Sequence, residues 1–77
     1  MLRVDYDRDV DALYVTLQED PCAYTRSLGE LRNVDYASDG KPVGVEWLRA
    51  SEGVDLADVP NAAEIGEALH GSFRVYA

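Results

Sequence analysis

The sequence predicts an α+β fold, in which an antiparallel four-stranded sheet from two hairpins carries one C-terminal helix and a short terminal strand. Apolar and polar residues alternate along two pairs of segments, which is typical of half-buried strands. Each pair is separated by a short stretch rich in Asp or Gly, as expected of a turn. From residue 61 onward the apolar residues follow helical spacing. We expect residues 1–77 to form a single small domain.

The first hairpin is predicted from residues 2–7 and 12–17, with Asp7 opposite Ala12. This register puts the apolar side chains of both strands on one face, whereas a shift by one residue would divide them between two faces. The predicted apolar pairs are Tyr6 with Leu13, Val4 with Val15, and Leu2 with Leu17.

Aspartate occurs at every second position around the turn of this hairpin (Asp5, Asp7, Asp9 and Asp11). An EF-hand calcium loop needs Gly at its sixth position and Glu at its twelfth. Counted from Asp7, these positions hold Ala12 and Gln18. We therefore expect a solvated turn, in which Asp side chains accept hydrogen bonds from nearby backbone N–H groups, and no metal site.

The second hairpin is predicted within residues 30–51, with Asp39 and Gly40 in its turn. With Ala37 opposite Pro42, the apolar residues again share a face. The facing pairs are Tyr36 with Val43, Val34 with Val45, and Arg32 with Trp47. We expect the Arg32 guanidinium to lie over the Trp47 ring.

The other face of this hairpin carries two carboxylates, Asp35 and Glu46, with Gly44 between them. A glycine within a strand indicates a bulge or the close approach of another backbone, here the linker or a second subunit. Paired carboxylates act as an acid and a base only in a cleft that removes water from them, and on an open sheet both stay ionised.

The segments outside the hairpins contain one helix and one further strand. Residues 18–30 form an irregular linker with an extended part at 23–26, and residues 51–60 form a loop. The helix spans residues 61–70, with Asn61 and Glu64 as a capping box and Gly71 at its C-terminal end. Residues 72–77 alternate again and form a strand, which pairs with its own sheet or with a neighbour's.

The chain is acidic, since 15 Asp and Glu residues against 7 Lys and Arg residues give a net charge of −8. Binding of nucleic acid or of an anionic membrane surface needs a basic patch, so we predict neither. A basic protein partner suits this charge. The single cysteine, together with the lack of a long apolar run or a secretory signal, favours a cytoplasmic protein.

Side chains for catalysis or for binding a metal are scarce. Cys22 and His70 are the only residues of their kinds, so they supply neither a disulfide nor a Cys/His zinc site. A nucleophilic cysteine needs a base, and the one histidine lies in the distant helix. We therefore predict no catalytic residue, no cofactor and no metal, and an enzyme is the least favoured class of function.

Two blocks of sequence carry a family resemblance: YDRDVDALYVTL at residues 6–17 and VDYASDGKPVGVEWLRAS at residues 34–51. Together they resemble the bacterial family catalogued as domain of unknown function 2283 (DUF2283), the YuzE-like proteins. The resemblance is close over residues 1–51 and loose over the helix and last strand at 61–77, and Trp47 stands where the family more often has an aliphatic residue. The family has no assigned reaction. Some members resemble the smaller partner of toxin–antitoxin-like gene pairs, which implies a binding role.

We therefore expect a small interaction module that associates with itself, most simply as a homodimer, and that binds a partner protein in the manner of an antitoxin. A domain of this size buries only about 60% of the surface that its unfolded chain exposes, so its stability is marginal, and the predicted sheet has two faces but one helix to cover them. The expected interface residues are Tyr14, Thr16, Gly44, Trp47, Phe73 and Tyr76. The alternative is a small-ligand-binding protein, with a pocket between sheet and helix or between subunits.

Overall fold

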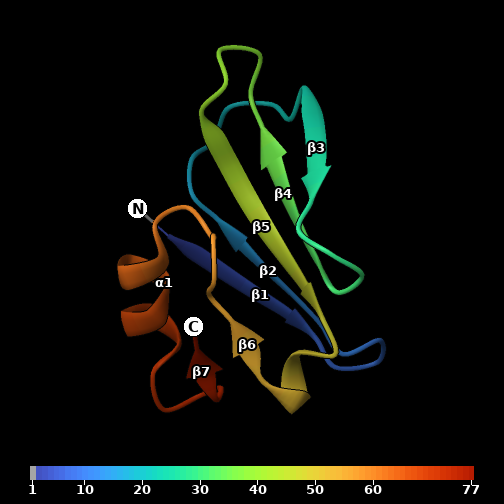
Figure 1. The fold of residues 1–77 in the computed structure, drawn as a ribbon, viewed down its shortest axis with the longest axis vertical. Helices are drawn as coiled ribbons and strands as arrows, with labels where there is room; N and C mark the ends of the chain where they lie inside the picture. The colour runs from blue at the N-terminus through green and yellow to red at the C-terminus, as the bar shows by residue number, and fades with distance from the viewer. Residues whose placement is uncertain (1) are drawn as a thin grey trace.

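A computed structural model describes residues 2–77 and shows two sheets. The larger sheet is antiparallel and has five strands in the order β1-β2-β5-β4-β3 (Figure 1). These strands are β1 (Arg3–Asp7), β2 (Ala12–Thr16), β3 (Tyr24–Ser27), β4 (Arg32–Tyr36) and β5 (Pro42–Leu48). The remaining elements are the 3-10 helix η1 (Ala50–Glu52), the helix α1 (Ala62–Leu69) and a parallel pair, β6 (Val54–Asp55) with β7 (Val75–Tyr76). The α+β class with an antiparallel sheet is confirmed.

The first hairpin has the predicted register, because Val4 lies opposite Val15, and Tyr6 opposite Leu13. Leu13 and Val15 are fully buried in β2, whereas the residues of β1 are all exposed because β1 forms an edge of the sheet. The alternating apolar side chains therefore identified which side of the hairpin faces the core.

The second hairpin follows the predicted register where residues 32–35 pair with residues 44–47, and it departs from that register toward the turn. Val34 lies opposite Val45 as predicted, but the register shifts between Asp35 and Tyr36, so that Tyr36 lies opposite Pro42. The predicted pairings of Tyr36 with Val43 and of Ala37 with Pro42 are therefore wrong. Proline has no N–H to donate to the ladder, and irregular pairing of this kind is common next to such a residue.

The sheet has five strands and not the predicted four, because part of the linker pairs with β4. Tyr24 lies opposite Tyr36, and their rings stack with centroids 5.2 Å apart. All four residues of β3 are exposed, so no alternation of buried apolar residues marked this strand. The predicted loop at residues 51–60 is also partly ordered, since it contains η1 and β6.

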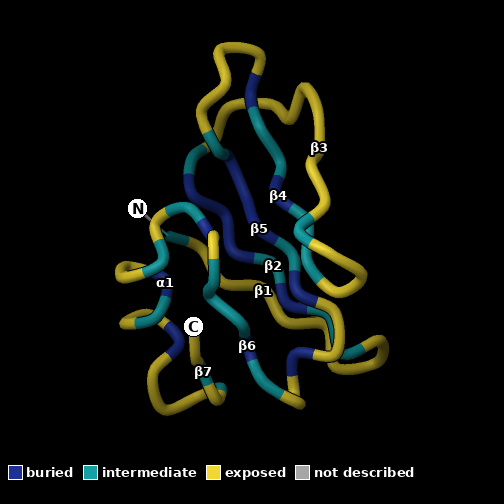
Figure 2. The backbone as a smooth tube through the Cα atoms, viewed as in Figure 1, coloured by how far each residue is buried: buried dark blue, intermediate teal, exposed yellow. Residues whose placement is uncertain are grey.

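One face of the large sheet, here called the inner face, is covered by the chain after residue 53. In Figure 1, α1, β6 and β7 gather beside β1 and β2, and β3 lies at the opposite edge. The buried stretches of β2, β4 and β5 meet this cover (Figure 2). The core consists of Leu13, Val15, Leu17, Val34, Val45, Trp47, Ala50, Val54, Val59, Ile65 and Leu69.

The two ends of α1 differ in how far they match the prediction. Asn61 has φ 58°, and its side-chain amide donates to Glu64 Oε1 (3.2 Å) without capping a backbone N–H, so the predicted capping box is absent. Gly71 has φ 88°, the left-handed conformation predicted after the helix. The last strand is shorter than predicted and pairs with β6, and not with the large sheet. Among the described residues, no helix combines the length and apolar character of a membrane span.

Arg32 and Trp47 hold the cover onto the inner face, and the predicted stacking between them is replaced by hydrogen bonds. The Arg32 guanidinium donates to the carbonyl oxygens of Asp55, Ala57 and Leu28. The Trp47 ring is 1 % exposed, and its Nε1–H donates to the Asp55 carbonyl (2.9 Å). Both side chains therefore satisfy backbone groups of the segment around β6.

Candidate functional site

The side of the large sheet that faces away from the core, here called the outer face, carries polar side chains from all five strands. Since strand residues alternate between the two faces, the register places Asp5, Tyr14, Glu46, Asp35 and Thr25 together on this side. Within residues 2–77, α1, β6 and β7 cover the inner face and leave the outer face open. Within residues 2–77, the outer face is therefore a regular surface that is open to another molecule.

Tyr14 crosses the outer face from β2 to β4. Its hydroxyl donates to Asp35 Oδ2 (2.7 Å), and the Thr25 hydroxyl in β3 donates to Asp35 Oδ1 (2.6 Å). The Tyr14 ring passes over Gly44 in β5, where a side-chain Cβ would overlap the ring and lie 2.7 Å from its Cε2. The close approach predicted at Gly44 is therefore made by a side chain of the same chain, and not by the linker backbone or a second subunit.

The bond between Tyr14 and Asp35 is a fixed link at neutral pH. Partial burial and the hydrogen bond to Asp35 raise the pKa of Tyr14 well above its ordinary value of 10.0. The phenol therefore stays protonated and donates its proton to a carboxylate, which makes a strong hydrogen bond. Because Asp35 also accepts from Thr25, this group ties β2, β4 and β3 together across the sheet.

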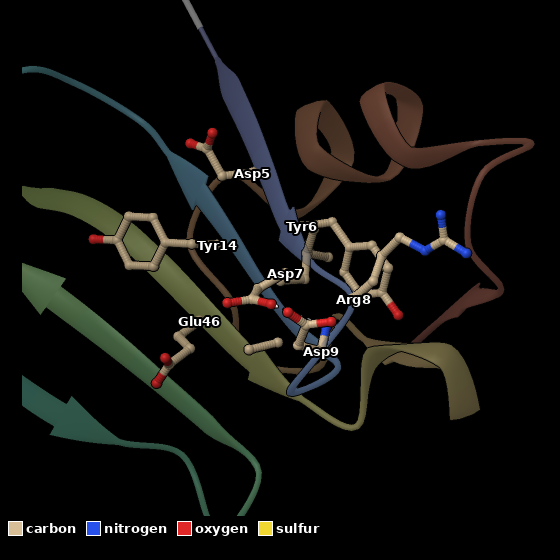
Figure 3. A pocket seen from close by; sticks show the side chains of 9 residues that line it. Asp5, Tyr6, Asp7, Arg8, Asp9, Tyr14 and Glu46 are labelled. Atoms are coloured by element: carbon tan, nitrogen blue, oxygen red, sulfur yellow. Dashed lines mark hydrogen bonds between the residues drawn. The ribbon is translucent and has the colours of Figure 1, made fainter.

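An open hollow of about 580 Å³ lies beside Tyr14, toward the turn between β1 and β2 (Figure 3). We call it the acidic hollow; it is lined by Asp5, Tyr6, Asp7, Arg8, Asp9, Ala12, Leu13, Tyr14 and Glu46. Four carboxylates face one guanidinium there, so the surface carries a net negative charge. Asp7 Oδ1 accepts the Asp9 N–H (3.0 Å), which is the turn bond that the sequence predicted.

Asp11 connects the turn of the first hairpin to the chain after β5. Its carboxylate accepts from the Ser51 hydroxyl (2.6 Å), the Tyr6 hydroxyl (2.6 Å) and the Ser51 N–H (2.9 Å). These bonds, with that from the Ser51 hydroxyl the strongest, lower the pKa of Asp11 below its ordinary value of 3.8. Asp11 is therefore more than a solvated turn residue, because it fixes the hairpin to η1.

We predict that replacing Asp11 with alanine destabilises the fold most at neutral pH and less in acid, where the cost of alanine in the left-handed backbone of this position (φ 56°) remains. A carboxyl whose pKa is lowered by folding contributes stability above its pKa in the unfolded chain, and this contribution is lost as the pH falls through its pKa in the folded chain. The gap between the two proteins in free energy of unfolding should be constant from pH 7 to about 5 and shrink below pH 3.8.

Urea titrations of both proteins at each pH measure this gap, with Ser51→Ala as a matched control. Ser51→Ala removes the hydroxyl donor but keeps the backbone N–H that also binds Asp11. Its effect should therefore be smaller than that of Asp11→Ala at neutral pH. A gap that stays unchanged down to pH 3 would contradict the proposed role of the ionised carboxylate.

The expected interface residues are divided between the two sides of the sheet. Tyr14, Thr16 and Gly44 lie on the outer face, where Thr16 and Gly44 are buried beneath their neighbours. Trp47 lies in the core and offers almost no area to a partner. Phe73 packs edge-on against Tyr6 (centroids 5.1 Å apart).

Tyr76 in β7 is 46 % exposed and lies under the Arg74 guanidinium, 5.1 Å from the ring centroid. It lies at a second hollow, of about 340 Å³, between the lower end of β4 and β5 and the parallel pair β6 and β7. Arg32, Trp47 and Asp55 also line this hollow. The polar groups of Arg32 and Trp47 are bonded to backbone carbonyls of the same chain. A ligand there would have to displace those bonds, so this hollow gives little support to the small-ligand alternative.

The sequence offers Cys22, His70 and the pair Asp35 and Glu46 as the side chains to consider for catalysis or metal binding. Cys22 is exposed in the segment before β3, and His70 directly follows α1. Among residues 2–77, no group of three or more His, Cys, Asp and Glu side chains is placed so that it could hold a metal ion. Asp35 and Glu46 share the outer face as predicted, with Asp35 bound to hydroxyls and Glu46 accepting from the Asn33 amide (3.2 Å).

Sequence reasoning missed Thr25 and Ser51, and it assigned no partner to Tyr14 or Asp11. Two signals could have found these links. Tyr14 and Gly44 are both predicted on the outer face, and a large ring beside a glycine in a strand suggests that the ring fills the space. Asp11 directly precedes β2 and Ser51 follows β5, so the two residues come close once β2 pairs with β5.

Comparison with known proteins places the hairpins in one family. The family model described as "Protein of unknown function (DUF2283)" matches residues 3–51, which is more than half of the chain. The match spans all five strands of the large sheet and η1 up to Ser51. No curated protein and no solved structure matches the chain.

Proposed function

The chain belongs to DUF2283, a family of proteins of unknown function, and we propose from its own surface that it is an interaction module that binds a basic segment of a partner protein on the outer face. The acidic hollow beside Tyr14 is the observation that supports this proposal. Its chemistry fits lysine or arginine side chains presented by another protein.

Three features make the acidic hollow a suitable surface for such a segment. The Arg3 guanidinium is drawn to Asp5 (3.3 Å) and Glu19 (3.6 Å), which leaves Asp7, Asp9 and Glu46 facing the hollow. Arg8 is the only cation in its lining. The charge of −8 over the whole chain also attracts a basic protein from a distance.

Tyr14 adds an apolar anchor next to these charges. Its ring is held in place by the bond to Asp35 and by the space above Gly44, so little side-chain entropy is lost when a partner packs on it. Aromatic side chains are enriched at protein interfaces, and a cation above such a ring gains a further attraction. The most concrete form of the proposal is an antitoxin-like protein that covers a basic surface of its partner.

The proposal is tested by titrating the ¹⁵N-labelled chain with a short peptide rich in Lys and Arg, and with a peptide in which Glu replaces these residues. We expect the basic peptide to shift amide signals at Asp7, Tyr14 and Glu46, and the acidic peptide to shift none. The triple variant Asp7→Asn, Asp9→Asn and Glu46→Gln keeps the shape of the side chains and one acceptor oxygen on each. It should weaken binding roughly tenfold, because each exposed ion pair contributes about 0.2–1 kcal/mol.

A matched variant separates a defined site from a general effect of charge. Glu30→Gln, Glu52→Gln and Glu67→Gln remove the same number of exposed carboxylates outside the acidic hollow. If this control weakens binding as much as the variant of the hollow, the peptide responds only to net charge and the outer-face site is wrong. Binding should also fall as salt is added, because exposed charges are screened.

A further inference from the structure

We propose that the chain forms a homodimer in which the β3 strands of two copies pair edge to edge, antiparallel about Thr25, so that two five-stranded sheets become continuous. This interface uses a part of the molecule different from the acidic hollow. It involves the backbone of β3 and the side chains of Tyr24 and Arg26.

β3 is the open edge of the large sheet. It pairs only with β4, its four residues are all exposed, and it lies away from α1, β6 and β7 (Figures 1 and 2). The Leu28 N–H donates to the Arg32 carbonyl (2.9 Å). Since hydrogen bonding alternates along an antiparallel strand, the backbone groups of Thr25 and Ser27 point away from β4. These groups are available to a further strand.

The other edge of the sheet is protected from such pairing, and β3 is not. β1 carries Arg3, Asp5 and Asp7 along its length, and charged residues on an edge strand discourage pairing with another sheet. β1 also borders the acidic hollow and has α1 beside it. The sequence of β3 is Tyr-Thr-Arg-Ser, without an acidic residue, so two copies of this acidic chain repel each other least at this edge.

The register of the pair follows from side-chain parity and charge. A two-fold axis perpendicular to the sheet keeps the inner faces of both copies on the same side, so facing residues must point to the same face. A centre at Arg26 would put two guanidinium groups opposite each other. A centre at Tyr24 would leave Ser27 without a partner strand.

A centre at Thr25 satisfies all these conditions. The Thr25 N–H of each copy then donates to the Thr25 carbonyl of the other, and the threonine side chains face each other on the outer face, a favourable pair between strands. Arg26 of each copy faces Tyr24 of the other on the inner side. The Tyr24 ring is 45 % exposed and is already held by stacking on Tyr36, so it presents a rigid face to the cation. Because the two-fold axis uses the same edge of both copies, the assembly stops at a dimer and leaves no free β3 edge.

The proposal is tested by sedimentation equilibrium over a range of concentrations. The chain should approach twice its mass of 8.5 kDa. Thr25→Pro removes the N–H at the centre of the pair without removing a donor to β4, and it should raise the dissociation constant roughly tenfold or more. Thr25→Val loses the same hydroxyl bond to Asp35 but keeps the N–H, so it should dimerise nearly as well as the unmodified chain.

A second pair of variants tests the register and does not depend on proline being tolerated. Arg26→Glu places a carboxylate against the Tyr24 ring of the other copy, while Arg8→Glu makes the same change of charge at the turn between β1 and β2. Only Arg26→Glu should weaken the dimer, by roughly tenfold. A chain that stays at 8.5 kDa at every concentration would overturn the proposal. So would a dimer that Thr25→Pro and Arg26→Glu leave as tight as their matched controls.

Discussion

Replacing Gly44 with alanine is expected to lower the free energy of unfolding by about 2–3 kcal/mol, although the change adds only one methyl group. The new methyl group would occupy the place of the Tyr14 ring above β5. Tyr14 must then swing away, and the bond between its hydroxyl and the Asp35 carboxylate is lost. Urea unfolding followed by Trp47 fluorescence measures the difference.

The same substitution in a Tyr14→Ala background gives the decisive control. Without the ring there is room for the methyl group, so the cost of Gly44→Ala should nearly disappear. If the cost is equal in both backgrounds, the ring is not the obstacle and our reading of Gly44 fails. Tyr14→Phe isolates the hydroxyl, since it keeps the ring over Gly44 and removes only the donor to Asp35.

Replacing Trp47 with alanine should have the largest effect of any single change, about 3–5 kcal/mol. The side chain is 1 % exposed and lies between the sheet and β6, where it also satisfies the Asp55 carbonyl. A domain of this length has a total stability of only about 4–12 kcal/mol. We therefore expect a fall of many degrees in the melting temperature, measured by circular dichroism because the fluorescent residue itself is removed.

Trp47→Phe is the matched variant, because it retains most of the apolar volume and loses the N–H donor. The Asp55 carbonyl still accepts from Arg32 (3.2 Å), so Trp47→Phe should cost clearly less than Trp47→Ala. Equal losses in the two variants would show that the hydrogen bond, and not the filled volume, is the main contribution of Trp47.

Much of the fold could be predicted from the sequence because side chains alternate between the two faces of a strand, and the apolar ones must all face the core. Val4, Val15, Val34 and Val45 lie in the predicted pairs, since a shift of one residue would expose half of them. β3 could not be predicted as part of the sheet, because its side chains are exposed on both faces and carry no pattern. The shift at Tyr36 also left no signal, since it depends on how the turn and Pro42 fit β4.

The candidate site was harder to predict, because it depends on the order of the strands. Tyr14 and Asp35 lie on strands that are not neighbours, and they meet only because β5 pairs between β2 and β4. The alternation of residues gives the face of each strand but not its neighbours. Asp11 and Ser51 illustrate the same limit, since 40 positions separate two residues that are joined by two hydrogen bonds.

The inner face is completed by residues that lie outside the segment shared with the family. The segment that matches the family stops at residue 51, whereas Val54, Val59, Ile65 and Leu69 come from beyond it. Without these four residues, the seven core residues of the matched segment, among them Leu13, Val15 and Val45, would be in contact with water. In this chain the segment shared with the family is therefore an open layer, and we expect a chain cut after residue 51 to aggregate unless another polypeptide shields the same apolar side.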